Sequence, residues 1–240
     1  MEALEARSLM PDSSPARVVA PFRFHTGFVL EEATGLRAAT LPQLAALLQK
    51  VPDGCIYYHT HYFLLAHHYL TPEPANDIAY WVTEVLGEDR LGELLASIDI
   101  MEYASLQGLR EAFVTMIDSY LEQNPSARLK FVAEGEELFF VKSIHVIMPT
   151  RYEAATLEQF ADALSQVSVR SLYFHMFDAR LRLGKPTNDF ATWLNEQLGL
   201  PELAEEFAHV NPHAHTLDVL RSILLSLVHQ TLKRPGTVHA

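Results

Sequence analysis

The stretch ATLPQLAALLQKVPDGCIYYH at Ala39–His59 recurs as ATLEQFADALSQVSVRSLYFH at Ala155–His175 without a gap. Nine of the 21 positions are identical, and the copies lie 116 residues apart. The similarity resumes between PANDIAYWVTEVLG at Pro74–Gly87 and PTNDFATWLNEQLG at Pro186–Gly199, where eight of 14 positions are identical. Matches of this length indicate an internal duplication. We therefore expect two related units packed about a pseudo-twofold axis.

Both copies carry the same signals for the start of a helix. The matching N-cap residues are Thr40 and Thr156, Asn76 and Asn188, and Ser105 and Thr216. Each is followed by apolar residues at helical spacing, and the two first threonines have a glutamine three positions later, as in a capping box. Trp81 and Trp193 stand five residues after the asparagine caps, and we expect both to anchor the core.

The segments that precede the copies predict strands. Pro21–Leu30 and Leu138–Met148 are rich in aromatic and β-branched residues, so each unit is expected to open with a short strand. Leu129–Val132 is a candidate extra strand, and continuous helices are expected over 55–70 and 171–183. The predicted fold is mostly α, an α+β fold with minor strand. Its expected parts are a disordered leader (1–20), a first repeat unit (21–123), a connector (124–137), a second repeat unit (138–234) and a tail (235–240).

Composition and charge exclude several classes of protein. The chain has 30 acidic and 18 basic residues, a formal net charge of -12, which repels phosphate backbones and argues against nucleic-acid binding. No stretch of 18 residues lacks both charge and imidazole, which argues against a membrane span. A lone cysteine, Cys55, and an N-terminus without the apolar core of a signal peptide favour the cytoplasm.

Several motifs in combination resemble a known family. They are Ile-Tyr-Tyr-His (56–59), Asn-Asp-Ile-Ala-x-Trp (76–81), Leu-Tyr-Phe-His (172–175), Ala-Arg-Leu-Arg-Leu-Gly (179–184), Asn-Asp-Phe-Ala-x-Trp (188–193) and Thr-Leu-x-x-Leu-Arg (216–221). This set is similar to a bacterial and archaeal family catalogued as a domain of unknown function, and the resemblance covers about residues 20 to 233. It implies no activity, cofactor or catalytic residue.

Histidines are the first candidates for chemistry. His59 and His175 are equivalent in the two copies, and each is either a hydrogen-bonded core residue or an acid/base group. Metal binding has little support, because the neighbouring His61, His67 and His68 give no pair at i,i+4 spacing. The loop pair at His213 and His215 would need further ligands from elsewhere. We expect no metal and no cofactor.

The sharper signal lies where the copies differ. Second-copy residues His175, Asp178 and Arg182 share one helical stripe, with Arg180 on another side. Lys185 follows, just before the cap formed by Asn188 and Asp189. Cations beside a helix N-terminus are suited to hold phosphate or carboxylate, so these side chains are ligand-binding candidates. The alternative is a surface ion pair between Asp178 and Arg182.

Two functions follow from these patterns. The preferred hypothesis is a non-catalytic binding or regulatory module that holds a small anionic metabolite or a protein partner at the cleft between the repeats. The alternative is an enzyme acting on a phosphorylated or carbohydrate-derived substrate, with His175 or His59 as acid/base. No nucleophile triad, glycine-rich phosphate loop or paired-carboxylate motif supports catalysis, so the sequence leaves open whether the protein is an enzyme. A large apolar surface patch would favour a protein-binding module.

Overall fold

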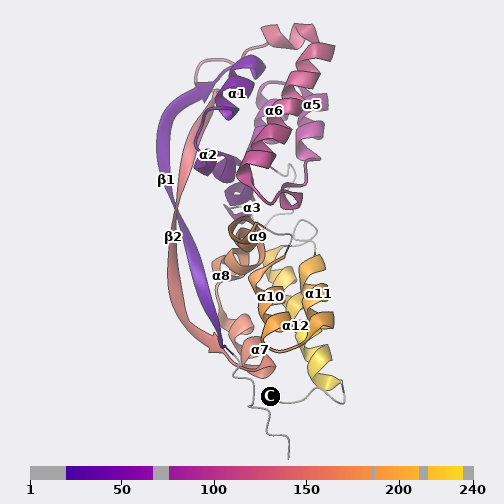
Figure 1. Ribbon diagram of the computed structural model, residues 1–240. Helices are drawn as coiled ribbons and strands as arrows, with labels where there is room; N and C mark the ends of the chain where they lie inside the picture. Colours follow the sequence, from indigo (N-terminus) through magenta and orange to yellow (C-terminus); the bar gives the residue numbers. More distant parts are fainter. Residues whose placement is uncertain (1–19, 67–75, 185–186, 211–215, 235–240) are drawn as a thin grey trace, which may run out of the picture.

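A computed structural model describes residues 20–66, 76–184, 187–210 and 216–234 (Figure 1). Strands β1 (Phe22–Ala38) and β2 (Leu138–Ala154) pair antiparallel in a two-stranded sheet, here called the ribbon. Helices from the two halves of the chain form two stacked groups, and the ribbon runs along one side of both groups (Figure 1). The chain is mostly helical with a minor β component, as the sequence predicts.

The two groups of helices follow each strand in turn. The first helical unit consists of α1 (Leu41–Leu48), α2 (Asp53–Tyr57), the π turn η1 (Tyr58–Tyr62), α3 (Phe63–Ala66), α4 (Asp77–Tyr80), the π turn η2 (Trp81–Val85), α5 (Asp89–Ala96), the 3-10 turn η3 (Ile100–Glu102), α6 (Leu106–Gln123) and the 3-10 turn η4 (Pro125–Leu129). The second helical unit consists of α7 (Leu157–Gln166), α8 (Val169–Tyr173), the π turn η5 (Phe174–Asp178), α9 (Ala179–Leu183), α10 (Asp189–Glu196), α11 (Pro201–His209) and α12 (Leu217–Lys233).

The helices predicted over 55–70 and 171–183 are not continuous α-helices. Each contains a π turn, at Tyr58–Tyr62 and at Phe174–Asp178, and residues 67–70 lie outside the described part of the chain. A π turn accommodates an extra residue and redirects the side chains around it, which is why such turns are frequent at specialised positions. Here each turn contains the histidine that bonds to the ribbon.

The predicted helix caps are present. Thr40 accepts a hydrogen bond from the backbone N–H of Gln43, whose side chain accepts one from the N–H of Ala39, the residue before the cap. This is a variant of the capping box, in which the return bond is one residue earlier. Thr156 and Gln159 make the same two bonds. The N-caps predicted at Ser105 and Thr216 begin α6 and α12.

Asn76 and Asn188 do more than cap. Each is fully buried and accepts a hydrogen bond from the N–H three residues later, at 2.8 Å in both cases. Each also donates through its side-chain amide to a backbone carbonyl of the next helix, Leu95 for Asn76 and Phe207 for Asn188. The two asparagines therefore fix the angle between successive helices as well as the helix start.

The strands are longer than predicted, and they cross between the units. Each has 17 residues, because pairing with the other strand continues beyond the core that either unit offers. The first residues of β1 pack in the second helical unit, where Phe22 and Phe24 contact Phe160 at ring-centroid distances of 5.9 and 5.7 Å. The first residues of β2 pack in the first unit, where Phe140 contacts His59.

The two tryptophans hold the chain just before each strand. Trp193 is buried and donates to the carbonyl of Ala20 at 2.8 Å, and Trp81 donates to that of Glu136 at the same distance. Their predicted burial is confirmed. Ala20, placed at the end of the expected leader, is thus bonded to the second helical unit, whereas residues 1–19 lie outside the described part of the chain.

The extra strand predicted at Leu129–Val132 is wrong. The segment is the end of η4 followed by extended chain, with one backbone bond from Val132 to the carbonyl of Ala39. A strand needs a neighbour along its length, and this single bond ties the connector to the end of β1. Leu129 and Phe131 instead project outward, with 81% and 77% of their surface exposed.

The double role of Asn188 sets an expected ranking of variants. Asn188→Ala should lower the free energy of unfolding by about 2–3 kcal/mol, because the cap is lost and the buried carbonyl of Phe207 loses its donor. Thr156→Ala, which removes a partly exposed cap, should cost about 1 kcal/mol. Urea denaturation of both variants measures the difference. Equal losses would mean that the bond to Phe207 contributes nothing.

Candidate functional site

His175 links the second helical unit to the ribbon. Its ring is 2% exposed, and its Nδ1–H donates to Asp189 Oδ2 at 2.7 Å. The other nitrogen, Nε2, accepts a hydrogen bond from the backbone N–H of His25 in β1 at 2.8 Å. Because Nε2 must present its lone pair to that N–H, the proton of the neutral ring sits on Nδ1.

His59 makes the same pair of bonds in the first unit. Its Nδ1 bonds Asp77 Oδ2 at 2.6 Å, and its Nε2 accepts from the N–H of Val141 in β2 at 3.3 Å. The ring is also 2% exposed. Both nitrogens of both rings are therefore engaged within the fold, and proton transfer to a substrate would require breaking one of these bonds. This geometry favours the reading of hydrogen-bonded core histidines.

These bonds also protect the edges of the ribbon. A strand at the edge of a sheet exposes backbone N–H and C=O groups that can pair with another chain. At His25 both groups are used, since the carbonyl accepts from Ser171 Oγ at 2.6 Å while the N–H donates to His175. The histidines thus attach each helical unit to the edge of a strand.

Arg182 belongs to α9, and its side chain reaches the start of α10, as the sequence suggests. The charge of its guanidinium is already paired there. Its Nη2 donates to Asp189 Oδ2 at 2.6 Å, and the guanidinium stacks over the ring of Phe174 at 4.2 Å. The alternative surface pair with Asp178 is not the hydrogen bond that forms. Arg182 and Asp189 therefore come together, with Asp189 standing where an external anion was expected.

The pKa values of Asp189 and His175 are shifted in this network. Burial alone would raise the pKa of Asp189, but the hydrogen bonds from His175 and Arg182 outweigh it and hold this pKa below its usual value. Burial lowers the pKa of His175, although Asp189 opposes the shift. The network is thus a neutral histidine and a cation sharing one carboxylate.

The remaining candidates do not bond to this network. Asn188 serves as the buried cap of α10. Arg180 points the other way, where its Nη2 donates to the carbonyl of Ala208 at 3.1 Å, and burial lowers its pKa while Asp99 opposes the shift. Lys185 lies outside the described residues, as do His213 and His215. In the described part of the chain, no group of three His, Cys, Asp or Glu side chains is placed to hold a metal ion.

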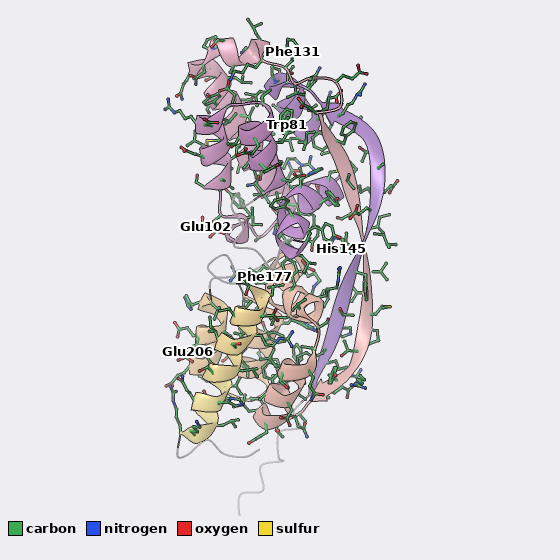
Figure 2. All side chains as sticks on the ribbon, turned by 180° about the vertical axis from the view of Figure 1, so that it is seen from behind. Trp81, Glu102, Phe131, His145, Phe177 and Glu206 are labelled. Carbon is green, nitrogen blue, oxygen red and sulfur yellow. The ribbon has the colours of Figure 1, made fainter. Side chains whose placement is uncertain are left out.

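Sequence reasoning missed a polar cluster between the two helical units. Tyr57 of the first unit donates to Asp178 Oδ1 of the second at 2.7 Å, and Tyr173 of the second donates to the carbonyl of His61 in the first at 2.6 Å. Figure 2 labels His145 on the ribbon beside this junction, and its ring contacts Tyr57 edge-on at 4.2 Å. The one signal in the sequence is that Tyr57 and Tyr173 hold the same position in the similar stretches Ala39–His59 and Ala155–His175.

Asp178 is the most perturbed carboxyl of this cluster. Burial raises its pKa to about 7, while the bond from Tyr57 and the charge of Arg182 oppose the shift. The side chain lies beneath the ribbon at Gly27, where an added Cβ would come within 4.0 Å of Asp178 Oδ2. The charge of Asp178 therefore changes near neutral pH at the contact between the units and the ribbon.

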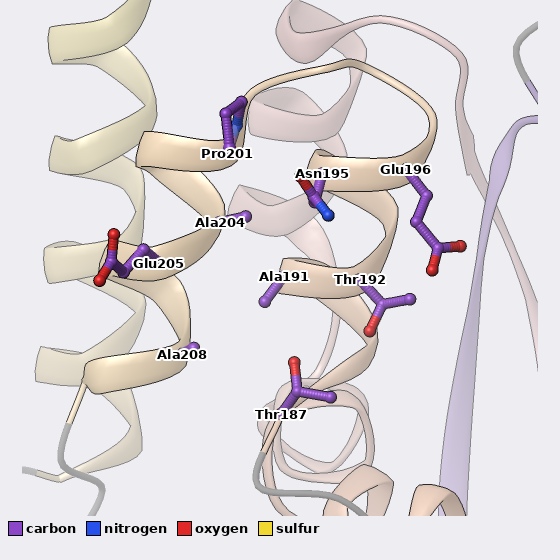
Figure 3. A pocket seen from close by; sticks show the side chains of 9 residues that line it. All are labelled: Thr187, Ala191, Thr192, Asn195, Glu196, Pro201, Ala204, Glu205 and Ala208. Carbon is purple, nitrogen blue, oxygen red and sulfur yellow. The ribbon is translucent and has the colours of Figure 1, made fainter.

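Two surface hollows that described residues line each lie inside one unit. The larger, about 560 Å³, lies between α10 and α11 and is lined by small and polar side chains such as Ala191, Thr192 and Ala204 (Figure 3). It also includes Glu196 and Glu205 and no cationic side chain, which makes it unsuited to an anion. The smaller, about 390 Å³, lies against α6 and likewise includes a glutamate and no cation.

Comparison with known proteins places this architecture in a family. Residues 19–229 match the model of a "Family of unknown function (DUF5752)". The chain belongs to this family. A solved structure of a similar protein, "The structure of OrfY from Thermoproteus tenax", superposes with a TM-score of 0.76 at 28% sequence identity, covering 90% of this chain and 97% of that one. The DUF5752 chain has no match among the curated proteins.

Within the described ranges of this DUF5752 chain, none of the helices combines the length and the apolar character that a membrane span requires.

Asp178→Asn is expected to stabilise the protein in a pH-dependent way. The folded pKa of Asp178 is raised above its unfolded value, so the native state binds more protons between pH 4 and 7, and its stability falls as the pH rises through this window. Asn cannot ionise and still accepts from Tyr57. The free energy of unfolding of the variant should therefore exceed that of the wild type by roughly 1–3 kcal/mol at pH 8 and by much less at pH 4.

Thermal or urea unfolding from pH 4 to 8 measures this effect. The exposed Asp162→Asn is the matched control and should follow the wild type at every pH. A constant difference between Asp178→Asn and the wild type across the range would show that ionisation of Asp178 does not affect folding.

His175→Phe tests whether the histidine holds the ribbon. The phenyl ring keeps most of the volume but loses both hydrogen bonds, so stability should fall by about 2–4 kcal/mol. Hydrogen exchange at the amide of His25 should accelerate, because its acceptor is gone. The exposed His209→Phe serves as control. Unchanged exchange at His25 would contradict the assigned role.

Proposed function

We propose that the protein is a non-catalytic protein-binding module whose binding surface is the outer face of the ribbon. This outer face consists of Phe28, Leu30, Ile144, Val146 and Met148, which are 39–57% exposed. Two cross-strand pairs form its centre, Phe28 with Val146 and Leu30 with Ile144. Contiguous exposed apolar side chains of this kind mark protein interaction sites, and this patch is the observation that carries the proposal.

The twist of the ribbon explains why these side chains face solvent. Phe22 and Phe24 are buried against the second helical unit. Phe28 and Leu30 lie on the same side of β1, because side chains alternate along a strand, yet they are exposed. In the middle of the ribbon the opposite side faces the helices, as Gly27 does toward Phe174. Right-handed twist turns one side of the strand from core to solvent along its length. The apolar character of the outer face is therefore not needed for the core of either unit.

The polar candidate residues support this assignment, because their hydrogen-bonding groups are bonded to other groups within the fold. The enzyme hypothesis relied on His59 or His175, and both ring nitrogens of each are engaged. The anionic metabolite relied on Arg180, Arg182 and Lys185, of which Arg182 is paired with Asp189 and Arg180 bonds the carbonyl of Ala208. The two hollows described above each lie inside one unit, and the exposed apolar side chains are our reason for placing the binding surface on the ribbon. We place this module in the cytoplasm, because its one cysteine, Cys55, is free and buried.

The proposal includes a duplication as the origin of the outer face. Residues 116 positions apart make matching bonds in the two units, for example His59 with Val141 and His175 with His25. Val29 and His145 have this separation and pair directly across the ribbon, which would put the pseudo-twofold axis between them. The same operation relates Phe28 to Ile144 and so makes the centre of the outer face nearly symmetric.

The double variant Phe28→Glu/Val146→Glu tests the proposed function. Tagged wild type should capture a specific protein from a lysate of the source organism, and this variant should reduce capture at least tenfold because it buries two charges against an apolar surface. Leu129→Glu/Phe131→Glu alters an apolar pair that is even more exposed and lies away from the outer face, and it should retain capture. The purified partner is then titrated against all three proteins by calorimetry. Equal binding by both variants would remove the proposal.

A further inference from the structure

The two units differ at the carboxylate that bonds each buried histidine. In the second unit, Asp189 Oδ2 accepts from His175 at 2.7 Å and from the guanidinium of Arg182 at 2.6 Å. In the first unit, Asp77 Oδ2 bonds His59 at 2.6 Å. Among the described residues, no lysine or arginine forms an ion pair with Asp77. The same histidine–carboxylate pair is thus completed by a cation in one unit and not in the other.

Arg182 has no counterpart in the first unit. The matching position, 116 residues earlier, is Ala66 at the end of α3, and this residue is exposed. An alanine side chain has no donor, so it cannot supply the bond that Arg182 makes. The carboxylate is correspondingly more accessible, since 29% of the side chain of Asp77 is exposed against 18% for Asp189. Residues 67–75, which follow Ala66, lie outside the described part of the chain and are not assigned to the site.

Aromatic rings lie at the same place in both units. Arg182 stacks over Phe174, with 4.2 Å from the guanidinium carbon to the ring centroid. Phe174 begins the π turn η5, and Tyr58 begins the matching turn η1. Tyr62, the last residue of η1, packs against Tyr58 at a centroid distance of 5.3 Å. Because the faces of aromatic rings attract cations, the first unit keeps an aromatic surface for a cation and adds a second ring to it.

Negative charge surrounds Tyr58. Burial is the largest cause that raises its pKa to about 12, and the charge of Glu31 on β1 and a hydrogen bond to Glu31 add to the shift. The charge of Asp77 acts in the same direction, so two carboxylates lie within electrostatic reach of one phenol. Lys142, on the neighbouring strand, is paired with Glu32 at 2.8 Å. The surroundings of Tyr58 therefore favour an additional positive charge.

We propose that the first unit binds a guanidinium group from outside the chain, in the place that Arg182 takes in the second unit. The guanidinium donates to the carboxylate of Asp77 and lies against Tyr58 and Tyr62. Arg182 supports this choice of ligand, because it is a guanidinium beside a histidine–carboxylate pair of the same geometry. A planar, delocalised cation can donate to a carboxylate while its face stacks on a ring, which an ammonium cannot do. The group belongs to a small molecule or to an arginine side chain of a partner protein.

The charge of the whole protein favours such a ligand. A net charge of -12 attracts cations to the surface and raises their local concentration, whereas it repels the anionic metabolite that the sequence suggests. The site goes beyond the proposed function, because Asp77, Tyr58 and Tyr62 are not part of the outer face of the ribbon. It does not depend on capture of a protein by that face.

NMR titration of the isotope-labelled full chain with methylguanidinium chloride, at constant ionic strength, tests the site. The amide signals of Asp77 and Tyr58 should shift and reach saturation. The matching signals of Asp189 and Phe174 serve as an internal control and should not shift, because Arg182 already fills that place. Methylammonium chloride should bind about fivefold more weakly or less, because it lacks the planar fork and the stacking face.

Variants at the two matching positions sharpen the test. Ala66→Arg supplies the guanidinium from the chain itself, so it should weaken methylguanidinium binding about tenfold or more and raise the melting temperature. Ala66→Glu places a long side chain of opposite charge at the same exposed position and should retain binding. Arg182→Ala should open a second site, so that saturable shifts appear at Asp189 and methylguanidinium restores part of the lost thermal stability.

The outcomes decide the site and the source of the guanidinium. A wild type without saturable shifts at Asp77, or shifts that persist in Ala66→Arg, overturns the inference, as does equal binding of methylammonium. An acetylated Gly-Arg-Gly peptide that binds about tenfold more tightly than methylguanidinium identifies an arginine of a partner protein, and equal affinities identify a small molecule. Phe28→Glu/Val146→Glu should bind methylguanidinium as the wild type does, which separates a failure of this site from a failure of the proposed function.

Discussion

The structure depends on a hydrogen bond between a strand and a buried imidazole. An edge strand must satisfy its outward N–H groups, and in this protein His175 and His59 accept two of them from within the helical units. A carboxylate on the other side of each ring fixes the tautomer that can accept. These two chains of bonds are what join helices from both halves of the sequence to one ribbon, and the aromatic packing around Phe22 and Phe140 follows from that attachment.

Much of the fold is predictable because its signals are local. The capping boxes, the asparagine caps and the burial of Trp81 and Trp193 each depend on a few neighbouring residues, and all are found as expected. Strand pairing is not local. Nothing in the sequence of Pro21–Leu30 indicates that its first residues pack against helices more than 130 residues later, because apolar alternation specifies a buried side and not its partner.

The sequence predicts which residues lie at the candidate site but not which bonds they form. Arg182, Asn188 and Asp189 do lie together, since the spacing of helix and loop brings them to one helix start. Their mutual bonds depend on rotamers and on burial, which spacing does not determine. Asp178 and Tyr57 belong to different units, so their contact has no trace in either local pattern. The two units also differ here, because Ala66 stands at the position that matches Arg182.

The exchange of strands between the units has a consequence for how the chain is made. The core around His59 includes Phe140, so the first helical unit cannot close until residues well beyond its own last helix have left the ribosome. The core around Phe160 includes Phe22, the first strand residue to be synthesised. Contacts this distant in sequence slow folding, because the entropy of loop closure is lost before the contacts form. The two halves therefore mature together, as one cooperative body that neither half can form alone during synthesis.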